Sequence, residues 1–268
     1  MTEPIFEGKD LHYSYDGVVA LDGASFCIRS GDRVALLGAN GSGKSTLLRI
    51  LGGLYFAQSG TVRFDGGVLA EARFENDESA FDFRRRVGML FQNPDVQLFN
   101  PTVFDEIAFG PLQLRWPADE IRARVAATME NLHITHLKNR PPHRLSGGEK
   151  KRVAIASVLI LDPQVLLLDE PTAALDPQSQ GQMIDMIARW KDSGRTVVTA
   201  THDLDSVEEI ADRCIVFQSG RVAAEGTPAT VLGDADLLQR TGLLHAHRHT
   251  HPSGETHSHA HHHHDHLE

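Results

Sequence analysis

The nine residues 38–46, GANGSGKST, decide the fold that this sequence predicts. An apolar run, residues 34–37, precedes them, and residues 45–54 continue as a helix-forming stretch. Glycines let consecutive backbone N–H groups curl around an anion, and the positive end of a following helix favours the same charge. An ordinary glycine-rich turn explains neither the strand before it nor the helix after it. The stretch therefore predicts a phosphate-binding loop.

Two side chains of this loop have the chemistry that a bound nucleotide requires. Lys44 can reach the β- and γ-phosphates, and the Ser45 hydroxyl can coordinate Mg²⁺. We therefore predict a bound nucleotide with Mg²⁺, although the loop alone does not separate kinases, GTPases and motor ATPases. The loop residues expected to contact the nucleotide are Gly38, Ala39, Asn40, Gly41, Ser42, Gly43, Lys44, Ser45 and Thr46.

A pair of acidic residues ends a second apolar run, residues 165–170, VLLLDE. Asp169, at the end of a buried strand, can hold Mg²⁺ directly or through water, and Glu170 can polarise an attacking water. Paired acids can also cap a following helix. The phosphate-binding loop elsewhere in the chain favours the hydrolytic interpretation.

Composition excludes several classes of protein. The 268 residues are 41% hydrophobic and 23% charged, as is ordinary for a globular protein, and the formal net charge is −10. We expect no nucleic-acid partner, because the chain lacks a basic footprint. No apolar run approaches the roughly 18 residues of a membrane-spanning helix, and the first residues do not form a signal peptide. Cys27 and Cys214 match no CxxC pattern, so reduced thiols are expected.

Strands and helices alternate along the chain, which predicts an α/β fold. Short strands are expected within residues 5–36, a mainly helical segment at about 95–150, and a hairpin turned at residues 219–220. Residues 179–194 predict a helix that Gly194 ends.

A third motif, LSGGE at residues 145–149, lies 24 residues before Asp169. With it, the chain resembles the ATP-binding-cassette (ABC) ATPases over residues 5 to about 225. The resemblance implies a phosphate-loop ATPase fold with an antiparallel β subdomain and a helical subdomain. The expected organisation is an ATPase domain at 5–244, with its helical part near 95–150 and a short extension at 226–244, and then a histidine-rich, disordered tail at 245–268.

The same resemblance assigns roles to single residues. Tyr15 is similar to the aromatic that stacks on adenine, although a plain strand aromatic stays open. Gln92 matches the glutamine that contacts Mg²⁺ and the water and couples the site to the membrane partner. Asp176 fits the loop that communicates between paired sites, and His202 fits the histidine that contacts the γ-phosphate. The implied catalytic residues are Glu170, His202, Gln92 and Lys44, and the implied Mg²⁺ ligands are Ser45, Gln92 and Asp169.

The LSGGE motif implies a dimer, because in this family it clasps the γ-phosphate of ATP bound to the other subunit. A helix N-terminus with bare backbone N–H groups suits that anion. The chain has one cassette, so it pairs with a copy of itself or with a sister chain, and both alternatives stay open. The motif residues are Leu145, Ser146, Gly147, Gly148 and Glu149.

Residues 91–114, FQNPDVQLFNPTVFDEIAFGPLQL, resemble ATPases of energy-coupling-factor importers, including those for cobalt and nickel. The implied partners are a transmembrane coupling protein and a substrate-capture membrane protein, and the implied location is the cytoplasmic face of the membrane. Two stretches depart from the family: residues 75–86 are longer and more acidic, and EKKR at 149–152 replaces a glutamine-containing ending. Neither departure is expected to affect a catalytic role.

The tail is rich in imidazoles, which suit Ni²⁺ and Co²⁺. A native metal-binding tail, a solvated tail without a role and a partly artificial end all stay open. For the whole chain, a vitamin importer, a soluble ABC ATPase and a metal-storage protein with a vestigial nucleotide site are the alternatives to a nickel or cobalt importer. The tail histidines are His245, His247, His249, His251, His257, His259, His261, His262, His263, His264 and His266.

Overall fold

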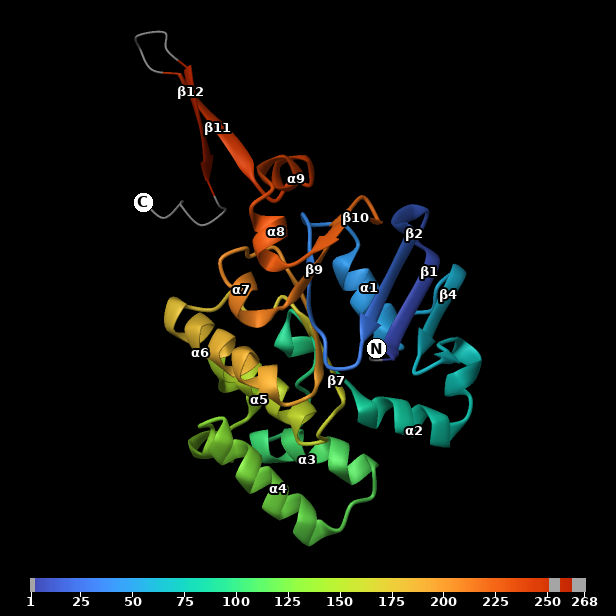
Figure 1. Ribbon diagram of the computed structural model, residues 1–268. Coiled ribbons are helices and arrows are strands. Elements are labelled where there is room, and N and C mark those ends of the chain that lie inside the picture. The colour runs from blue at the N-terminus through green and yellow to red at the C-terminus, as the bar shows by residue number, and fades with distance from the viewer. Residues whose placement is uncertain (1–2, 251–255, 262–268) are drawn as a thin grey trace.

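A computed structural model describes residues 3–250 and 256–261, and its centre is a six-stranded sheet (Figure 1). The strand order is β10-β9-β3-β8-β7-β6, in which β10 is antiparallel to β9 and the other neighbours are parallel. The strands are β3 (Arg33–Leu37), β6 (Val87–Leu90), β7 (Val165–Asp169), β8 (Thr196–Thr201), β9 (Arg213–Gln218) and β10 (Arg221–Gly226).

A second, antiparallel sheet lies beside the first, in the order β2-β1-β4-β5. The sequence predicts short strands here, whereas β1 and β2 have twelve residues each. Register shifts between them, one of them between Gly8 and Leu11, break the alternation of apolar and polar side chains. That is why two long strands look like several short ones in the sequence. The strands are β1 (Pro4–Tyr15), β2 (Val18–Arg29), β4 (Ser59–Phe64) and β5 (Gly67–Val68).

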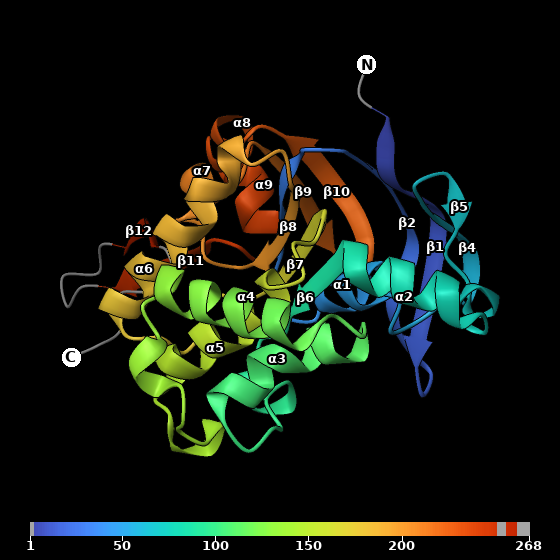
Figure 2. The ribbon, with the colours of Figure 1, turned by 90° about the horizontal axis from the view of Figure 1, so that it is seen from below.

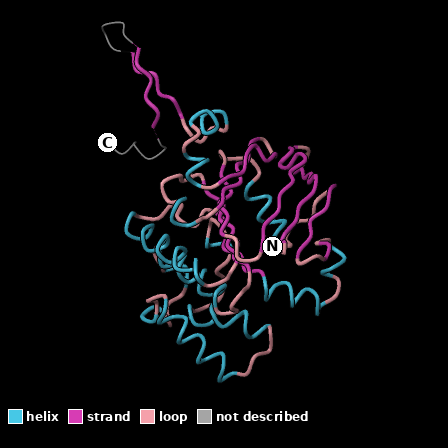
Figure 3. Tube along the Cα trace, in the orientation of Figure 1, coloured by secondary structure: helices cyan, strands magenta, loops and turns pink. Residues whose placement is uncertain are grey.

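Helices cover the six-stranded sheet, and a group of them extends below it (Figures 1 and 3). The α-helices are α1 (Lys44–Leu51), α2 (Asp77–Arg86), α3 (Val103–Gln113), α4 (Ala118–Asn131), α5 (Gly147–Leu159), α6 (Pro177–Ala188), α7 (Val207–Ile210), α8 (Pro228–Leu232) and α9 (Ala235–Arg240). The 3₁₀ turns are η1 (Glu71–Phe74), η2 (Pro94–Val96), η3 (Thr135–Leu137), η4 (Pro142–Arg144) and η5 (Arg189–Asp192).

Strand β3 shows how the core is layered. All five of its residues are buried, as expected for a parallel strand covered on both faces. Val34 and Leu36 pack with α1 and the antiparallel sheet, whereas Ala35 and Leu37 pack with α5, α6 and the C-terminal helices. The predicted α/β class with an antiparallel β subdomain is confirmed.

Helices α3, α4 and α5 lie together and form a third cluster, the helical subdomain (Figure 2). Ile121, Val125 and Met129 recur every fourth residue along α4, and all three are buried there. The sequence periodicity therefore gives the buried face of this helix correctly.

The structure corrects the end of helix α6. The sequence predicts a helix as far as Gly194, but α6 ends at Ala188 and a 3₁₀ turn follows. The tighter turn accompanies burial of Trp190 in the cluster that holds Ile187.

The histidine-rich segment carries the last two strands among the described residues. Its backbone forms a hairpin of β11 (His245–Thr250) and β12 (Thr256–His261), which extends away from the body (Figure 1). These strands make a sheet separate from the other two.

Candidate active site

The predicted site residues gather at one edge of the six-stranded sheet. Strands β3, β8 and β7 are parallel neighbours, so their carboxyl ends lie together. The phosphate-binding loop follows β3, Asp169 and Glu170 lie at the end of β7, and His202 follows β8. Such an edge is where open α/β sheets bind ligands.

The loop itself requires glycine at two positions. Gly38 has φ 149° and Gly43 has φ 111°, values that residues with side chains rarely adopt. A Cβ atom on Gly38 would lie 2.5 Å from the carbonyl oxygen of Phe217, and one on Gly43 would lie 2.6 Å from that of Ala20. The loop therefore packs closely against β9 and β2 before helix α1 begins.

Lys44 lies inside this loop with 5% of its surface exposed. Its Nζ donates to the carbonyl oxygens of Gly38 at 2.6 Å and Ala39 at 3.1 Å. Burial lowers its pKa, whereas the carboxylates of Glu170 and Asp169 raise it. The Ser42 hydroxyl is buried as well and has no hydrogen-bond partner among the described residues, so the loop offers polar donors for phosphate oxygens.

Ser45 and Asp169 join the loop to strand β7. The Ser45 hydroxyl donates to Asp169 Oδ1 at 2.8 Å, although the two residues are 124 positions apart. Asp169 is 2% exposed, and desolvation raises its pKa while the Ser45 hydrogen bond lowers it. The sequence-predicted hydroxyl and carboxylate are thus brought into direct contact.

Glu170 and His202 form the second pair. His202 Nδ1 and Glu170 Oε1 lie 2.9 Å apart, and the Glu170 backbone N–H donates to the Ala200 carbonyl at 2.9 Å. The hydrogen bond to Glu170 raises the pKa of His202, and burial opposes the shift. Glu170 has φ 45°, in the left-handed region, so its backbone turns sharply just after β7.

Tyr15 belongs to a group of three tyrosines near the phosphate-binding loop. Its hydroxyl lies 3.3 Å from the Thr46 hydroxyl, and its ring packs edge-on against Tyr13 and Tyr55. Arg49 lies over the Tyr55 ring at 5.8 Å. Sequence analysis missed Tyr55 and Arg49, although both lie within ten residues of the loop.

The LSGGE segment begins helix α5. Ser146 is the N-cap: its Oγ accepts from the Glu149 N–H at 3.3 Å, and the Glu149 carboxylate accepts from the Ser146 N–H at 2.8 Å. This capping box lowers the pKa of Glu149. Leu145 is buried, and a Cβ atom on Gly148 would lie 2.6 Å from Ser179 Oγ. Among the described residues, no hydrogen bond joins residues 145–149 to the phosphate-binding loop.

The other predicted positions lie around this edge. Gln92 is exposed two residues after β6. Asp176 caps helix α6, where its Oδ1 accepts from the Ser179 N–H at 3.0 Å, and its hydrogen bonds with Ser179 lower its pKa. Neither residue contacts Glu170 through a hydrogen bond within the part of the chain that the structure describes.

A residue that sequence analysis did not select lies beneath Glu170. Lys151 is 2% exposed, and its Nζ donates to the backbone carbonyls of Glu170, Pro171 and Ala173 at 2.8, 2.9 and 2.9 Å. Burial lowers the pKa of this lysine to about 8, and the carboxylates of Glu170 and Asp169 oppose that shift.

An apolar patch follows Gln92 in the chain, on η2, the segment after it and α3. Val96, Phe99, Phe109 and Leu112 are 69%, 66%, 36% and 56% exposed. The Phe99 and Phe109 rings pack edge to face, with centroids 4.9 Å apart. Buried Glu106 supports the patch from below, since its carboxylate accepts from the N–H groups of Phe99 and Asn100 at 2.8 Å.

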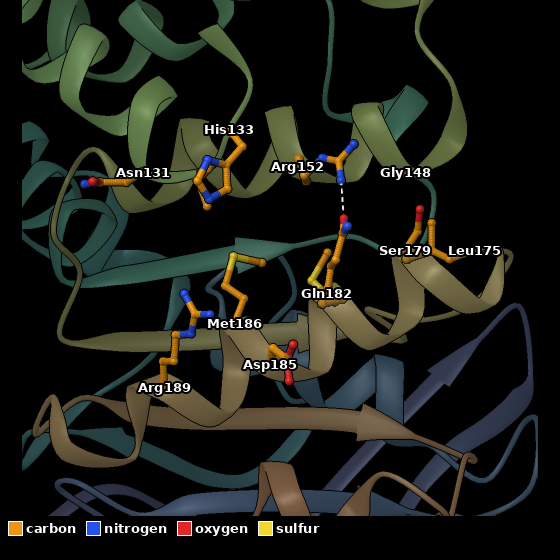
Figure 4. A pocket seen from close by; sticks show the side chains of 12 residues that line it. Asn131, His133, Gly148, Arg152, Leu175, Ser179, Gln182, Asp185, Met186 and Arg189 are labelled. Atoms are coloured by element: carbon orange, nitrogen blue, oxygen red, sulfur yellow. Dashed lines mark hydrogen bonds between the residues drawn. The ribbon is translucent and has the colours of Figure 1, made fainter.

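A cavity of about 320 Å³ lies between the end of α4 and helices α5 and α6, and Gly148 is part of its lining (Figure 4). Arg152 of α5 reaches Gln182 of α6 across it with a hydrogen bond. His133, Met186 and Arg189 also line this space. The cavity is next to the LSGGE segment and does not include the phosphate-binding loop.

Five of the predicted tail histidines, His251, His262, His263, His264 and His266, lie outside the described residues. Among the described side chains, no cluster of three or more histidine, cysteine or acidic residues could hold a metal ion. Within residues 3–250 and 256–261, no helix has the length and hydropathy to span a membrane.

Comparison with known proteins identifies relatives along nearly the whole chain. Residues 21–173 match the model of the ABC transporter family. The chain is 55% identical over 244 residues to the nickel import ATP-binding protein NikO of Rhodobacter capsulatus, covering 90% of this chain and 96% of that protein. It is 43% identical over 240 residues to the energy-coupling factor transporter ATP-binding protein EcfA of Methanothermobacter thermautotrophicus, covering 89% and 76%.

One solved structure has a similar fold over the same length. It is cbiO1 from Clostridium perfringens, described as part of the ABC transporter complex cbiONQ, and it has a TM-score of 0.76 at 38% identity. The match covers 90% of this chain and 95% of that one.

Proposed function

We propose, from the premise that this chain belongs to the ABC transporter family, that it is the ATPase subunit energising import of nickel or cobalt ions. Binding and hydrolysis of ATP follow from the family. The cargo is supported by the 55% identity to a nickel import ATP-binding protein over 90% of the chain. The energy-coupling-factor type of transporter is supported by the similarity to EcfA.

We assign the nucleotide contacts to the edge formed by β3, β7 and β8. Lys44, Ser42 and the N–H groups of residues 38–46 would hold the phosphates, because the loop presents buried donors there. Tyr15 would stack on adenine, since its hydroxyl reaches Thr46 at the beginning of helix α1.

Mg²⁺ fits the oxygen atoms that the chain offers. The Ser45 hydroxyl and the Asp169 carboxylate touch at 2.8 Å, and Mg²⁺ prefers such hard oxygen ligands while keeping several waters. Gln92 would supply a third oxygen from the end of β6. When bound, the ion would neutralise charge on the β- and γ-phosphates.

Hydrolysis is assigned to the Glu170–His202 pair. Glu170 is 6% exposed and would take a proton from the attacking water, a role in which a carboxylate must lie within hydrogen-bond reach. His202, held at 2.9 Å by Glu170, would orient this water and contact the γ-phosphate.

Two chains would complete the site between them. The N-terminus of α5, with Ser146, Gly147 and Gly148, presents bare N–H groups suited to a phosphate of the partner's ATP. A dimer bound to ADP and Pi is known for a relative, MJ0796, which is 28% identical and has a TM-score of 0.74. The second chain is a copy of this one or a sister ATPase.

We assign the contact with the membrane partner to the apolar patch. Exposed Phe99, Phe109 and Leu112 follow Gln92 in the chain, so a helix of a transmembrane coupling protein docked on them would be connected to the nucleotide site through this segment. The chain would then lie peripherally on the cytoplasmic face, together with a substrate-capture membrane protein. The histidine-rich tail would buffer or receive Ni²⁺ or Co²⁺ there.

Uptake of labelled nickel and cobalt tests the function. Cells expressing the native transport locus with the intact chain are compared with cells carrying Glu170→Gln. Loss of the uptake of one ion in the variant is expected. Unchanged uptake of both ions, with the variant shown to lack ATPase activity, would contradict a metal cargo and favour a vitamin importer or a soluble ABC ATPase.

A further inference from the structure

The side chain of Lys151 is buried, and its ammonium group donates hydrogen bonds to the turn after strand β7. All three N–H bonds of its ammonium group are directed to backbone carbonyls, those of Glu170, Pro171 and Ala173. A buried ammonium with three acceptors is fully satisfied, and each of these hydrogen bonds is charge-assisted.

The turn that receives these hydrogen bonds is strained. Glu170 has φ 45° and Ala174 has φ 58°, both in the left-handed region that residues with a Cβ atom avoid. Such a conformation persists only where the surroundings impose it. Lys151 contacts the carbonyl of the first strained residue and the carbonyl just before the second.

Lys151 also belongs to the helix that presents the LSGGE segment. It lies five residues after Ser146, the N-cap of α5. The cavity of about 320 Å³ lies between α5 and α6 beside Arg152, whereas Gly148 of α5 packs closely against Ser179 of α6 (Figure 4). Arg152 donates a hydrogen bond to Gln182 of α6, and the three hydrogen bonds of Lys151 connect α5 to the turn after β7.

We propose that Lys151 is a positioning residue that couples the LSGGE end of helix α5 to the backbone of Glu170 in the same chain. Ser146 would contact a phosphate of the ATP bound to the partner chain, whereas Glu170 would act on the water that attacks the ATP bound to its own chain. The three hydrogen bonds thus connect the two sites of a dimer through each subunit. The inference rests on ATP hydrolysis and on pairing of two chains, not on the identity of the transported ion.

The test uses the purified full-length protein with Lys151→Met, which keeps the length of the side chain and removes its donors. Turnover is expected to fall about tenfold to hundredfold, the effect of losing charged hydrogen bonds. The affinity for a fluorescent ATP analogue is expected to stay within about twofold, because Lys44 and the phosphate-binding loop are intact. The Hill coefficient for ATP is expected to fall toward about 1 as the two sites lose their coupling.

Lys150→Met is the matched control, since this lysine precedes Lys151 in α5 but its Nζ pairs with Asp95 at 2.7 Å. It is expected to retain turnover and cooperativity. Lys151→Arg keeps the charge and is expected to restore part of both. Lys151→Gln, which keeps two donors, is the substitute if the methionine variant does not fold, and it is expected to have intermediate turnover.

The proposal is overturned if Lys151→Met, or Lys151→Gln in its place, keeps turnover and cooperativity within about twofold of the parent. It is also overturned if turnover and ATP affinity fall together and Lys151→Arg behaves like Lys151→Met. That second result would leave Lys151 a purely structural residue. Nickel and cobalt uptake does not enter either comparison, so failure here is distinguishable from failure of the proposed cargo.

Discussion

His202 Nδ1 lies 2.9 Å from Glu170 Oε1, which joins the carboxyl ends of two neighbouring strands, β8 and β7. The two residues are 32 positions apart in the chain. Their contact places the carboxylate that we assign as the base next to an imidazole, with Lys44 and Asp169 also close enough to shift pKa values in the site.

Replacing Glu170 with glutamine is expected to abolish most of the hydrolysis while leaving ATP binding intact. The amide keeps the shape of the side chain but cannot accept a proton, so turnover should fall roughly 10²–10⁴-fold, as for loss of a general base. Phosphate release measures turnover, and gel filtration with ATP measures the dimer, which should persist. Glu208→Gln, an exposed glutamate of α7, is the control. Normal turnover in Glu170→Gln would show that another group acts as the base.

The contact between His202 and Glu170 predicts a pH-dependent contribution to stability. The hydrogen bond to Glu170 raises the pKa of His202 above its ordinary 6.5, so folding favours the protonated ring. Stabilisation by this contact is therefore complete below the ordinary pKa and is lost as the pH rises through the raised value. The difference in Tm between the parent and His202→Ala should be larger at about pH 6 than at about pH 9.

Exposed His143 provides the control for this titration, because its replacement by alanine should not produce the same trend. Lys44 opposes the shift at His202, and Asp203 supports it. A Tm difference for His202→Ala that grows with rising pH would contradict the assignment.

Lys44→Ala is expected to weaken nucleotide binding. The variant loses a buried ammonium group that lies within the phosphate-binding loop, so the affinity for ATP should fall about tenfold to hundredfold, as for a lost charged hydrogen bond. Titration with a fluorescent ATP analogue measures the change. Lys9→Ala, which removes a surface lysine from β1, should bind normally. Equal affinities for Lys44→Ala and the parent would remove Lys44 from the proposed phosphate contacts.

The apolar patch predicts a variant that loses its membrane partner but keeps its ATPase activity. Phe99→Asp places a charge in the centre of the patch, and loss of a buried aromatic anchor typically costs at least about 2 kcal/mol of binding. Co-purification with solubilised membrane proteins from the native locus should fall, while turnover of the isolated protein stays normal. Phe81→Asp, which replaces an exposed phenylalanine of α2, is the control. Equal recovery of partners with both variants would place the membrane contact elsewhere.

Much of the fold and the nucleotide edge could be predicted because local patterns specify them. The apolar runs of β3, β7 and β8 indicate buried parallel strands, and parallel strands bring their carboxyl ends to one edge. Positive φ angles and close backbone contacts require glycine at Gly38 and Gly43. Hence the loop and the acidic pair indicate the proximity of Ser45 to Asp169, whereas the pairing of Glu170 with His202 is implied by the resemblance to the ABC ATPases.

Other features could not be predicted because their partners are not visible in the sequence. Lys151 binds backbone carbonyls, which every residue has, so no pattern of side chains indicates the contact. The tyrosine group combines rings from β1 with Tyr55 after α1, and only the tertiary fold brings them together. The bulges between β1 and β2 likewise interrupt the alternation of apolar and polar side chains, so the sequence does not show that the two strands are long.

The place of β3 in the middle of the six-stranded sheet has a mechanical consequence. Hydrogen bonds to β8 on one side and β9 on the other hold the root of the phosphate-binding loop. Strain at the nucleotide would therefore pass into the whole sheet, whereas α3 and α4 lie in no sheet and share their core with α5. The phosphate-binding loop is thus anchored directly in the sheet, whereas α3 and α4 are connected to the sheet through α5, which contacts β6.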